Sequence, residues 1–463
     1  MPPDADPIAL GGPGSASIAA QSGEGAARSA QSDEAAARTA QSDEAAARTT
    51  QPGEAEARGA HPHWVRRTVQ FLTGQTISLF GSSLVQYAIL WYLTLDTKSG
   101  VVLTAATVLG FLPQAIVSVF GGVWADRHDR KRLIIGADLV IALSTLALAL
   151  AFLEGSGELW MVLLAMAIRS AATGVQQPAV GAVLPQIVPT THLMRVNGIN
   201  ASIGSAMMLL SPAVAAALFA AFGLTAVLFV DVATAVIGVG LLAALAVPRL
   251  PRPTELVGYT EDLRAGLRYA RNHHAVGWIL VSFAVVFFLV VPPSYLTPLL
   301  IVRSFGEEVW MLTANEVAFS IGMVLGGAAL AAWGASRDRM ALLTGATVAM
   351  GVITVLLGLA PLLWVFLALM FLVGLVVPAF STTSSTMLQE SVELDMQGRV
   401  FGLLGIVMAL AMPAGMAVFG PLADVVSVEV VLIVGGVVTV LVGLVIRARA
   451  PEFRPPQDAQ LAS

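Results

Sequence analysis

The sequence contains no cysteine, which excludes disulfide bonds, thiol nucleophiles and metal sites held by cysteine. It also has few charges: Asp, Glu, Lys and Arg make up 12% of its 463 residues. Soluble domains carry about 25%. The mean hydropathy is +0.80. A chain so poor in charge and so apolar is typical of a membrane protein, and we expect a polytopic helical one.

Motifs for several catalytic sites are also missing. There is no G-x-x-x-x-G-K-[ST] stretch for an ATPase site and no H-E-x-x-H zinc motif. The only lysines, Lys98 and Lys131, both fall outside the middle of a predicted membrane span, which argues against a Schiff base. We therefore expect a protein that is not an enzyme and that binds no cofactor, no metal and no nucleic acid.

Residues 1–62 differ in composition from the rest of the chain. From Ala20 the sequence repeats every ten residues (AQSGEGAARS, AQSDEAAART, AQSDEAAART, TQPGEAEARG), with almost no large apolar residues. Such a segment cannot bury enough apolar surface to order itself, and it lacks the basic and apolar regions of a signal peptide. We predict a disordered cytoplasmic tail here and a second cytoplasmic tail over 448–463.

Twelve apolar stretches of membrane-spanning length follow Trp64. A helix needs about 20 apolar residues to cross a bilayer, and more when it is tilted. We predict an all-α fold of two six-helix bundles, at 63–247 and 276–447, joined by a cytoplasmic linker at 248–275. The predicted spans are 69–94, 100–123, 133–153, 159–182, 197–221, 224–247, 276–301, 312–334, 341–360, 362–385, 401–422 and 427–446.

Basic residues orient these spans. If both termini lie inside, eighteen Lys and Arg residues after the tail fall on the cytoplasmic side, and only Lys98 and Arg303 fall outside. Cytoplasmic loops carry such an excess of positive charge. We therefore predict a multi-pass membrane protein with both termini in the cytoplasm.

The linker contains the stretch EDLRAGLRYARNHH. In a helix, Leu263, Leu267 and Ala270 share one face, while three arginines take another. This pattern predicts an amphipathic helix on the inner membrane surface. It is open whether that helix only connects the halves or also regulates them.

The two halves repeat a short motif. Residues 122–136 (GVWADRHDRKRLIIG) align with 331–345 (AAWGASRDRMALLTG) at an offset of 209, which pairs Asp129 with Asp338. Parallel repeats of six spans occur in a known transporter architecture.

The loop after the second span holds a recognisable set of residues: Gly122, Asp126, Arg127, Arg130 and Lys131. A glycine, an aspartate four residues later and a basic cluster resemble the loop signature of the major facilitator superfamily, although Asp129 stands where a glycine is common. The resemblance implies a cytoplasmic gate latch. Asp126 can satisfy a helix N-terminus or a basic partner in one state and lose that contact in the other.

Further stretches resemble one group of that superfamily, the macrolide-efflux and enterobactin-exporter group. They include GSSLVQYAILWYL, QQPAVGAVLPQIVP, DLRAGLRYAR and MQGRVFGL. The resemblance implies proton-coupled efflux of amphipathic small molecules by alternating access, from a monomer in a bacterial inner membrane. Export of a siderophore or other metabolite, import of a nutrient, and a non-transporting sensor remain open.

Arg169 lies near the middle of the fourth span, where a charge costs at least ~2.5–3.5 kcal/mol on insertion scales. It resembles the superfamily's span-4 arginine linked to proton coupling, although Gly174 departs from the usual spacing. Thr173 and either Gln176 or Gln177 share its helical face. We predict a substrate path or coupling site at Arg169, Thr173 and Gln177, with a structural arginine bound to carbonyls as the alternative.

The first span carries a polar stripe of Gln75, Ser78, Ser82 and Gln86 at helical spacing. Such a stripe is unfavourable against lipid and natural against a water-filled cavity. We predict that it lines the substrate path; hydrogen bonds between helices are the alternative.

Three acids, Asp138, Asp231 and Glu316, fall within the first two turns of predicted spans. The helix dipole favours an acid there, so such a residue needs no other role. Asp231 is the deepest and is the best candidate for a proton carrier.

The fifth span carries Gly204, Ser211 and Pro212. This set resembles a degenerate form of the glycine-rich motif of the superfamily's antiporters, which favours export. Small residues also allow close helix contacts, and we predict such packing here.

Overall fold

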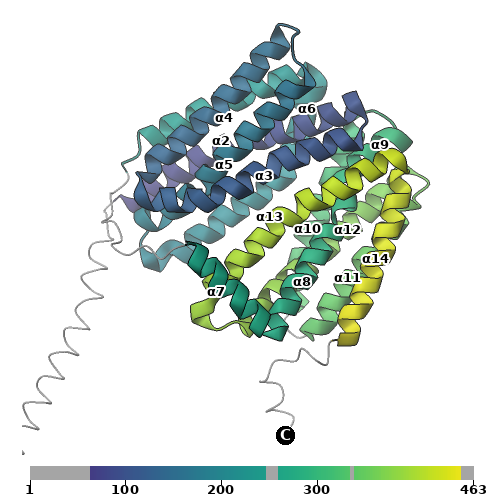
Figure 1. Cartoon of the computed structure of the whole chain (residues 1–463). Helices are drawn as coiled ribbons and strands as arrows, with labels where there is room; N and C mark the ends of the chain where they lie inside the picture. Colours follow the sequence, from purple (N-terminus) through teal and green to yellow (C-terminus); the bar gives the residue numbers. More distant parts are fainter. Residues whose placement is uncertain (1–62, 247–258, 334–337, 450–463) are drawn as a thin grey trace, which may run out of the picture. The chain divides into compact units, whose positions relative to one another are not determined.

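The computed structural model describes residues 63–246, 259–333 and 338–449, and within these ranges the chain is helical. The predicted N-terminal tail, most of the C-terminal tail and the first part of the linker lie outside the described residues. The described helices, drawn in Figure 1, are α2 (Trp64–Thr97), α3 (Gly100–Arg127), α4 (Arg130–Leu153), α5 (Leu159–Ile187), α6 (Thr190–Ala243), α7 (Tyr259–Asn272), α8 (His274–Leu289), η1 (Pro292–Leu296), α9 (Thr297–Ser304), α10 (Val309–Trp333), α11 (Arg339–Gly358), α12 (Leu363–Ser391), α13 (Leu394–Val425) and α14 (Val428–Arg449).

These helices make twelve membrane crossings. Eleven described segments are long and apolar enough to span a bilayer, and α8, η1 and α9 together form one of them. Helix α6 has 54 residues and breaks at Gly223, whose φ of 74° suits glycine. The break separates the predicted spans 197–221 and 224–247, so α6 crosses twice. The predicted all-α membrane fold is confirmed.

The motif that repeats at an offset of 209 residues lies at the start of one helix in each half of the chain. Asp129 is the N-cap of α4 and accepts a hydrogen bond from the amide of Arg132, at 3.3 Å. Asp338 is the N-cap of α11 and accepts one from the amide of Met340, at 2.9 Å. Aspartate is a favoured cap because it satisfies amides that have no partner within the helix. The aspartate that replaces the common glycine in the loop signature therefore starts a helix.

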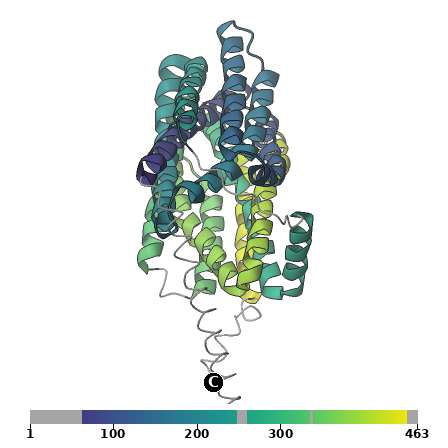
Figure 2. The same cartoon turned by 90° about the vertical axis from the view of Figure 1, so that its left-hand side faces the viewer.

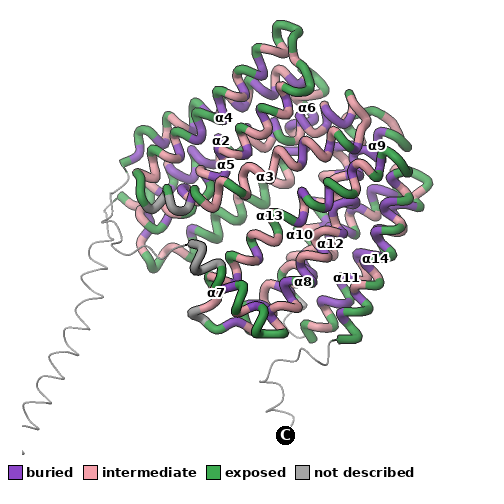
Figure 3. Tube along the Cα trace, in the orientation of Figure 1, coloured by how far each residue is buried: buried purple, intermediate pink, exposed green. Residues whose placement is uncertain are grey.

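Helix α14 presents large apolar side chains on its exposed face, and several of its buried residues are small. On α14, the exposed side chains include Val430, Val434 and Leu441, whereas Gly436 and Thr439 are buried. Figure 3 shows this alternation of exposed and buried turns along the helix. Small residues at helix contacts and large apolar ones outside are what lipid favours.

The same helix contacts occur twice. We call α2–α6 the first half and α8–α14 the second half. Helix α3 packs on α5 and α4 on α6; six crossings later, α10 packs on α12 and α11 on α14. Between the halves, α3 packs on α13 and α6 on α10. Figures 1 and 2 show the purple-to-blue helices on one side and the green-to-yellow helices on the other.

The linker helix α7 packs on the second half. Gly266 approaches α13 so closely that a Cβ there would lie 3.1 Å from the Arg399 carbonyl oxygen. Ala270 is buried, but Leu267 is 51% exposed. The two members of the predicted apolar face whose side chains are described, Leu267 and Ala270, thus differ in burial, and the placement of the helix on the inner membrane surface stays a prediction.

Candidate functional site

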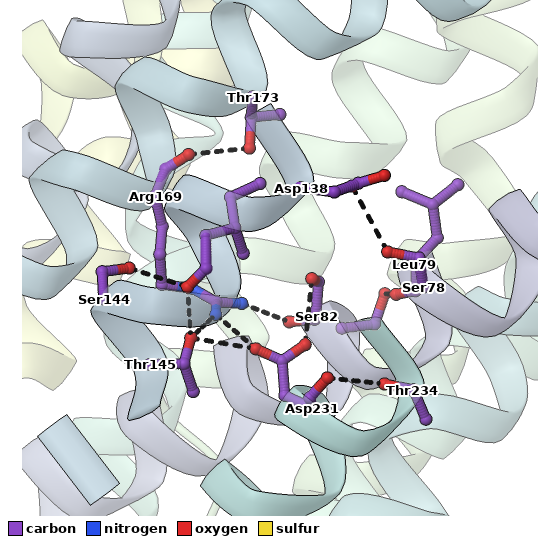
Figure 4. A network of polar contacts seen from close by, with 12 residues as sticks. Ser78, Leu79, Ser82, Asp138, Ser144, Thr145, Arg169, Thr173, Asp231 and Thr234 are labelled. Atoms are coloured by element: carbon purple, nitrogen blue, oxygen red, sulfur yellow. Dashed lines mark hydrogen bonds and ion pairs between the residues drawn. The ribbon is translucent and has the colours of Figure 1, made fainter. Parts of the chain in front are cut away.

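A buried ion pair joins two crossings of the first half. The guanidinium of Arg169 on α5 lies 2.5 Å from Oδ2 of Asp231 on α6, and the Asp231 side chain is fully buried. Ser82 on α2 donates a hydrogen bond to Oδ1 of Asp231 at 3.1 Å, and Thr145 on α4 donates to Oδ2 at 3.0 Å. Arg169 also contacts Thr145 and the carbonyl of Ser82. Residues of α2, α4, α5 and α6 thus meet at this carboxylate (Figure 4).

The close approach of α2 to α6 depends on Gly81. A Cβ at Gly81 would lie 1.9 Å from Thr234 Oγ1 and 3.0 Å from the Asp231 Cα. The glycine therefore brings Ser82 within hydrogen-bonding distance of Asp231. Arg169 is bound chiefly by the Asp231 carboxylate. The contact with a carbonyl, which the alternative prediction called for, is also present at Ser82.

A second buried carboxylate, Asp138 on α4, lies near the first. Asp138 is 1% exposed. Its Oδ1 accepts hydrogen bonds from Ser78, at 3.4 Å, and from Gln176. Its Oδ2 has no partner, and no cation pairs with Asp138 among the described residues. Ser78 and Ser82, one turn apart on α2, thus connect the two carboxylates (Figure 4).

A cavity of about 390 Å³ opens beside this network. Its wall is built mainly from α2, α3 and α5, with Tyr295 of η1 from the second half. The predicted residues on the wall are Ser82, Gln86, Arg169, Thr173 and Gln177.

The structure places Gln75, Ser78 and Asp231 away from the cavity wall, buried between helices. Ser78 makes a hydrogen bond between helices, as the alternative reading of the stripe predicts. Only one part of the polar stripe, at Ser82 and Gln86, therefore lines the cavity. The other part, at Gln75 and Ser78, lies between helices.

Several polar residues of this region were not predicted, among them Thr145, Gln114 and Tyr295. Thr145 lies two turns after Asp138 on the same helix, and that spacing could have indicated it. Gln114 on α3 donates a hydrogen bond to Gln177 across the cavity wall, at 3.2 Å. Tyr295 comes from the other half, and no pattern in the sequence links it to this site.

The basic residues of the predicted latch bind helix ends within the first half. Arg130 donates a hydrogen bond to the Ala182 carbonyl of α5, at 2.8 Å. Lys131 donates to the carbonyls of Ala243 and Leu245 at the end of α6, both at 2.7 Å. A cation at a helix C-terminus complements the helix dipole. Arg127 is exposed.

The surroundings of Gly122 and the side chain of Asp126 lie outside the described part of the chain. The gate contact predicted for Asp126 therefore stays a prediction.

The predicted packing set in the fifth span is only partly buried. Ser211 and Pro212 are buried in α6. Gly204 is exposed, and a Cβ there would have no neighbour within 4 Å. The expectation of a close helix contact at Gly204 is not met in this conformation, because that turn of α6 faces open space.

A compact cluster joins the halves at the end of the molecule that holds Lys98. We call it the Asp424 cluster, after the carboxylate near the end of α13. Asp424 accepts hydrogen bonds from the amides of Gly100, at 2.7 Å, and Val101, at 2.9 Å, at the start of α3. Arg303 binds both Asp424 and the Lys98 carbonyl, each at 2.6 Å. A carboxylate of one half thus caps a helix of the other.

A family model described as the Major Facilitator Superfamily matches residues 71–314 and 304–462. The chain belongs to this superfamily. Macrolide efflux protein A of Streptococcus pyogenes is 32% identical over 387 residues, covering 83% of this chain and 96% of that protein. Macrolide efflux protein A of Enterococcus faecalis is 32% identical over 314 residues, covering 67% and 97%. The predicted family and group are confirmed.

Solved structures share the fold. A bacterial homologue of the iron transporter ferroportin, in an inward-facing state, has a TM-score of 0.61 at 16% identity, covering 82% of this chain and 98% of that one. The nucleoside transporter NupG also has a TM-score of 0.61, at 13% identity and the same coverage. This superfamily member is therefore a multi-pass secondary transporter with efflux proteins among its relatives.

Proposed function

We propose that this transporter exports macrolide-like amphipathic molecules from the bacterial cytoplasm in exchange for protons. The observation that carries the proposal is the pair of buried carboxylates, Asp138 and Asp231, behind the wall of a cavity. Relatives of similar length are macrolide efflux proteins. A cavity with both polar and apolar walls suits an amphipathic molecule.

Asp138 is proposed to carry the proton. Taking an ion out of water without a counter-charge costs several kcal/mol, and the described residues offer Asp138 no cation. A proton removes that cost. Gln176 binds Asp138 and also lines the cavity, so it connects the carboxyl group to the substrate site. Asp231 differs because Arg169 already neutralises it.

Alternating access is proposed to proceed by rocking of two bundles, at 63–247 and 276–447, with both termini in the cytoplasm and a monomer as the working unit. The Asp424 cluster would then lie on the outer face and hold it closed. Toward the opposite face, residues 197–202 and 204–206 of α6 are all exposed. This combination suits a conformation that opens toward the cytoplasm.

Everted membrane vesicles test the proposed function. We expect them to accumulate a radiolabelled macrolide when respiration acidifies the lumen, and to stop when nigericin collapses the pH gradient. Vesicles without the protein are the control. If accumulation does not depend on the pH gradient, the proposal of proton coupling fails. If vesicles with the protein accumulate no more macrolide than vesicles without it, the assigned substrate is wrong.

The variant Asp138→Asn keeps the size and most hydrogen bonds of the side chain but cannot exchange a proton. We expect gradient-driven accumulation to fall at least about tenfold, equivalent to ~1.4 kcal/mol, while exchange of labelled for unlabelled substrate continues. The measurement is uptake in both modes in proteoliposomes. Ser78→Ala is a matched control that removes one hydrogen bond and should retain driven uptake. Full driven uptake by Asp138→Asn would exclude Asp138 as the carrier.

A further inference from the structure

The linker helix α7 has one face that contacts the rest of the protein and one that does not. It packs on α13 and on α8, at the end of the molecule where both helices begin (Figure 1). Gly266 and Ala270, one turn apart, are buried. The backbones lie close together, since a Cβ at Gly277 of α8 would lie 2.6 Å from the Ala270 carbonyl oxygen. These contacts determine which face of α7 points away from the protein.

The face of α7 that points away carries three arginines and one leucine. Its members recur every three or four residues, which places them on one side of a helix. We call them the arginine face: Arg264, Leu267, Arg268 and Arg271, all of them exposed. Among the side chains that the structure describes, no carboxylate pairs with these arginines. The arginine face is therefore positively charged and has no counter-charge there.

Two other arginines at this end of the protein are bound by the protein itself. Arg339, at the start of α11, pairs with Glu390 near the end of α12. Arg399 of α13 donates a hydrogen bond to the sulfur of Met396, at 3.2 Å. The arginine face differs from both, because its charge is available to a ligand from outside the chain.

The position of the arginine face and its leucine indicate a lipid as that ligand. Helix α7 ends at Asn272, and α8, the start of a membrane crossing, begins at His274. An exposed leucine among arginines is typical of a helix that lies at a membrane surface, with its apolar side chain between the headgroups. Leu267 is 51% exposed on the same side as the arginines.

Basic residues at a membrane surface attract anionic lipids. We propose that the arginine face binds the headgroups of anionic phospholipids, such as phosphatidylglycerol, and so anchors the second half to the membrane surface. This inference goes beyond export and holds whatever molecule the protein carries.

A fluorophore on α7 tests which lipids gather at the arginine face. Because the chain has no cysteine, Asn272→Cys at the exposed end of the helix takes a single label. The labelled protein is reconstituted in phosphatidylcholine vesicles that contain a minor fraction of a nitroxide lipid, either phosphatidylglycerol or phosphatidylcholine. We expect the nitroxide phosphatidylglycerol to quench the fluorophore at least about threefold more strongly.

Two triple variants and a second label position complete the test. In Arg264→Gln/Arg268→Gln/Arg271→Gln the two nitroxide lipids should quench equally, whereas the same triple change to lysine keeps the charge and should keep the preference. At Glu154→Cys, an exposed position after α4, the two lipids should also quench equally.

Three results would overturn the inference. The first is equal quenching by the two lipids at Asn272→Cys with all three arginines present, which needs no arginine variant to fold. The second is a preference that survives the triple change to glutamine. The third is an equally strong preference at Glu154→Cys, since the enrichment would then not belong to α7.

Discussion

Replacing Asp231 with asparagine should abolish proton-driven export and lower the stability of the folded protein. The substitution leaves the guanidinium of Arg169 without its carboxylate in a site that is almost closed to solvent. Breaking a buried ion pair in this way costs about 3–5 kcal/mol. The loss is measured as a lower midpoint of thermal unfolding in detergent, and as the loss of gradient-driven uptake in proteoliposomes.

A double variant separates stability from transport. In Arg169→Gln/Asp231→Asn both charges are gone, so most of the lost stability should return, because replacing a whole buried pair is close to neutral. Driven uptake should not return, because the double variant also removes the Arg169 guanidinium from the cavity wall. Thr145→Val is a control that keeps both charges; it removes the hydrogen bonds that the hydroxyl makes with Asp231 and Arg169 and should cost about 2 kcal/mol. Restored uptake in the double variant would show that the pair serves folding alone.

Replacing Gly100 with alanine should prevent the Asp424 cluster from closing. A Cβ at Gly100 would lie 2.1 Å from the Gly420 carbonyl oxygen, which belongs to the other half and cannot rotate away. Overpacking of this kind typically costs about 1–3 kcal/mol. We expect the end of the molecule at Lys98 to open and the rate of export to fall about tenfold.

The absence of cysteine makes this opening measurable. With Gln86→Cys in the cavity, a membrane-impermeant maleimide added to intact cells should label Gly100→Ala at least about tenfold faster than the parent. Gly240→Ala is the matched control, because a Cβ there has no neighbour within 4 Å. Equal labelling rates with and without Gly100→Ala would contradict the assignment of the Asp424 cluster as the outer closure.

The membrane crossings were predictable because lipid permits few alternatives to an apolar helix. The twelve predicted spans correspond to the observed crossings, including the break at Gly223. Helix ends were less predictable: the predicted span 401–422 lies within α13, which runs Leu394–Val425. Hydropathy marks only the part of a helix in hydrocarbon, whereas its hydrogen bonds continue into the polar region.

The charged members of the site were predictable, but their pairing was not. Arg169 and Asp231 are separated by 62 residues, and helical periodicity gives no rotation of one helix relative to another. The same limit left Gln176 and Gln177 undecided, since one residue turns a side chain by 100°. The contacts of Asp424 depend on how the two halves meet, which local patterns do not encode.

Proton movement caused by substrate is the most direct test of the exchange mechanism. In everted vesicles with an acidic lumen, followed with a pH-sensitive acridine dye, a saturating macrolide should release protons and raise the fluorescence. The signal should appear with the wild-type protein and vanish in Asp138→Asn and in Arg169→Gln/Asp231→Asn. Accumulation of the macrolide by the wild-type protein with no release of protons would contradict proton-coupled export.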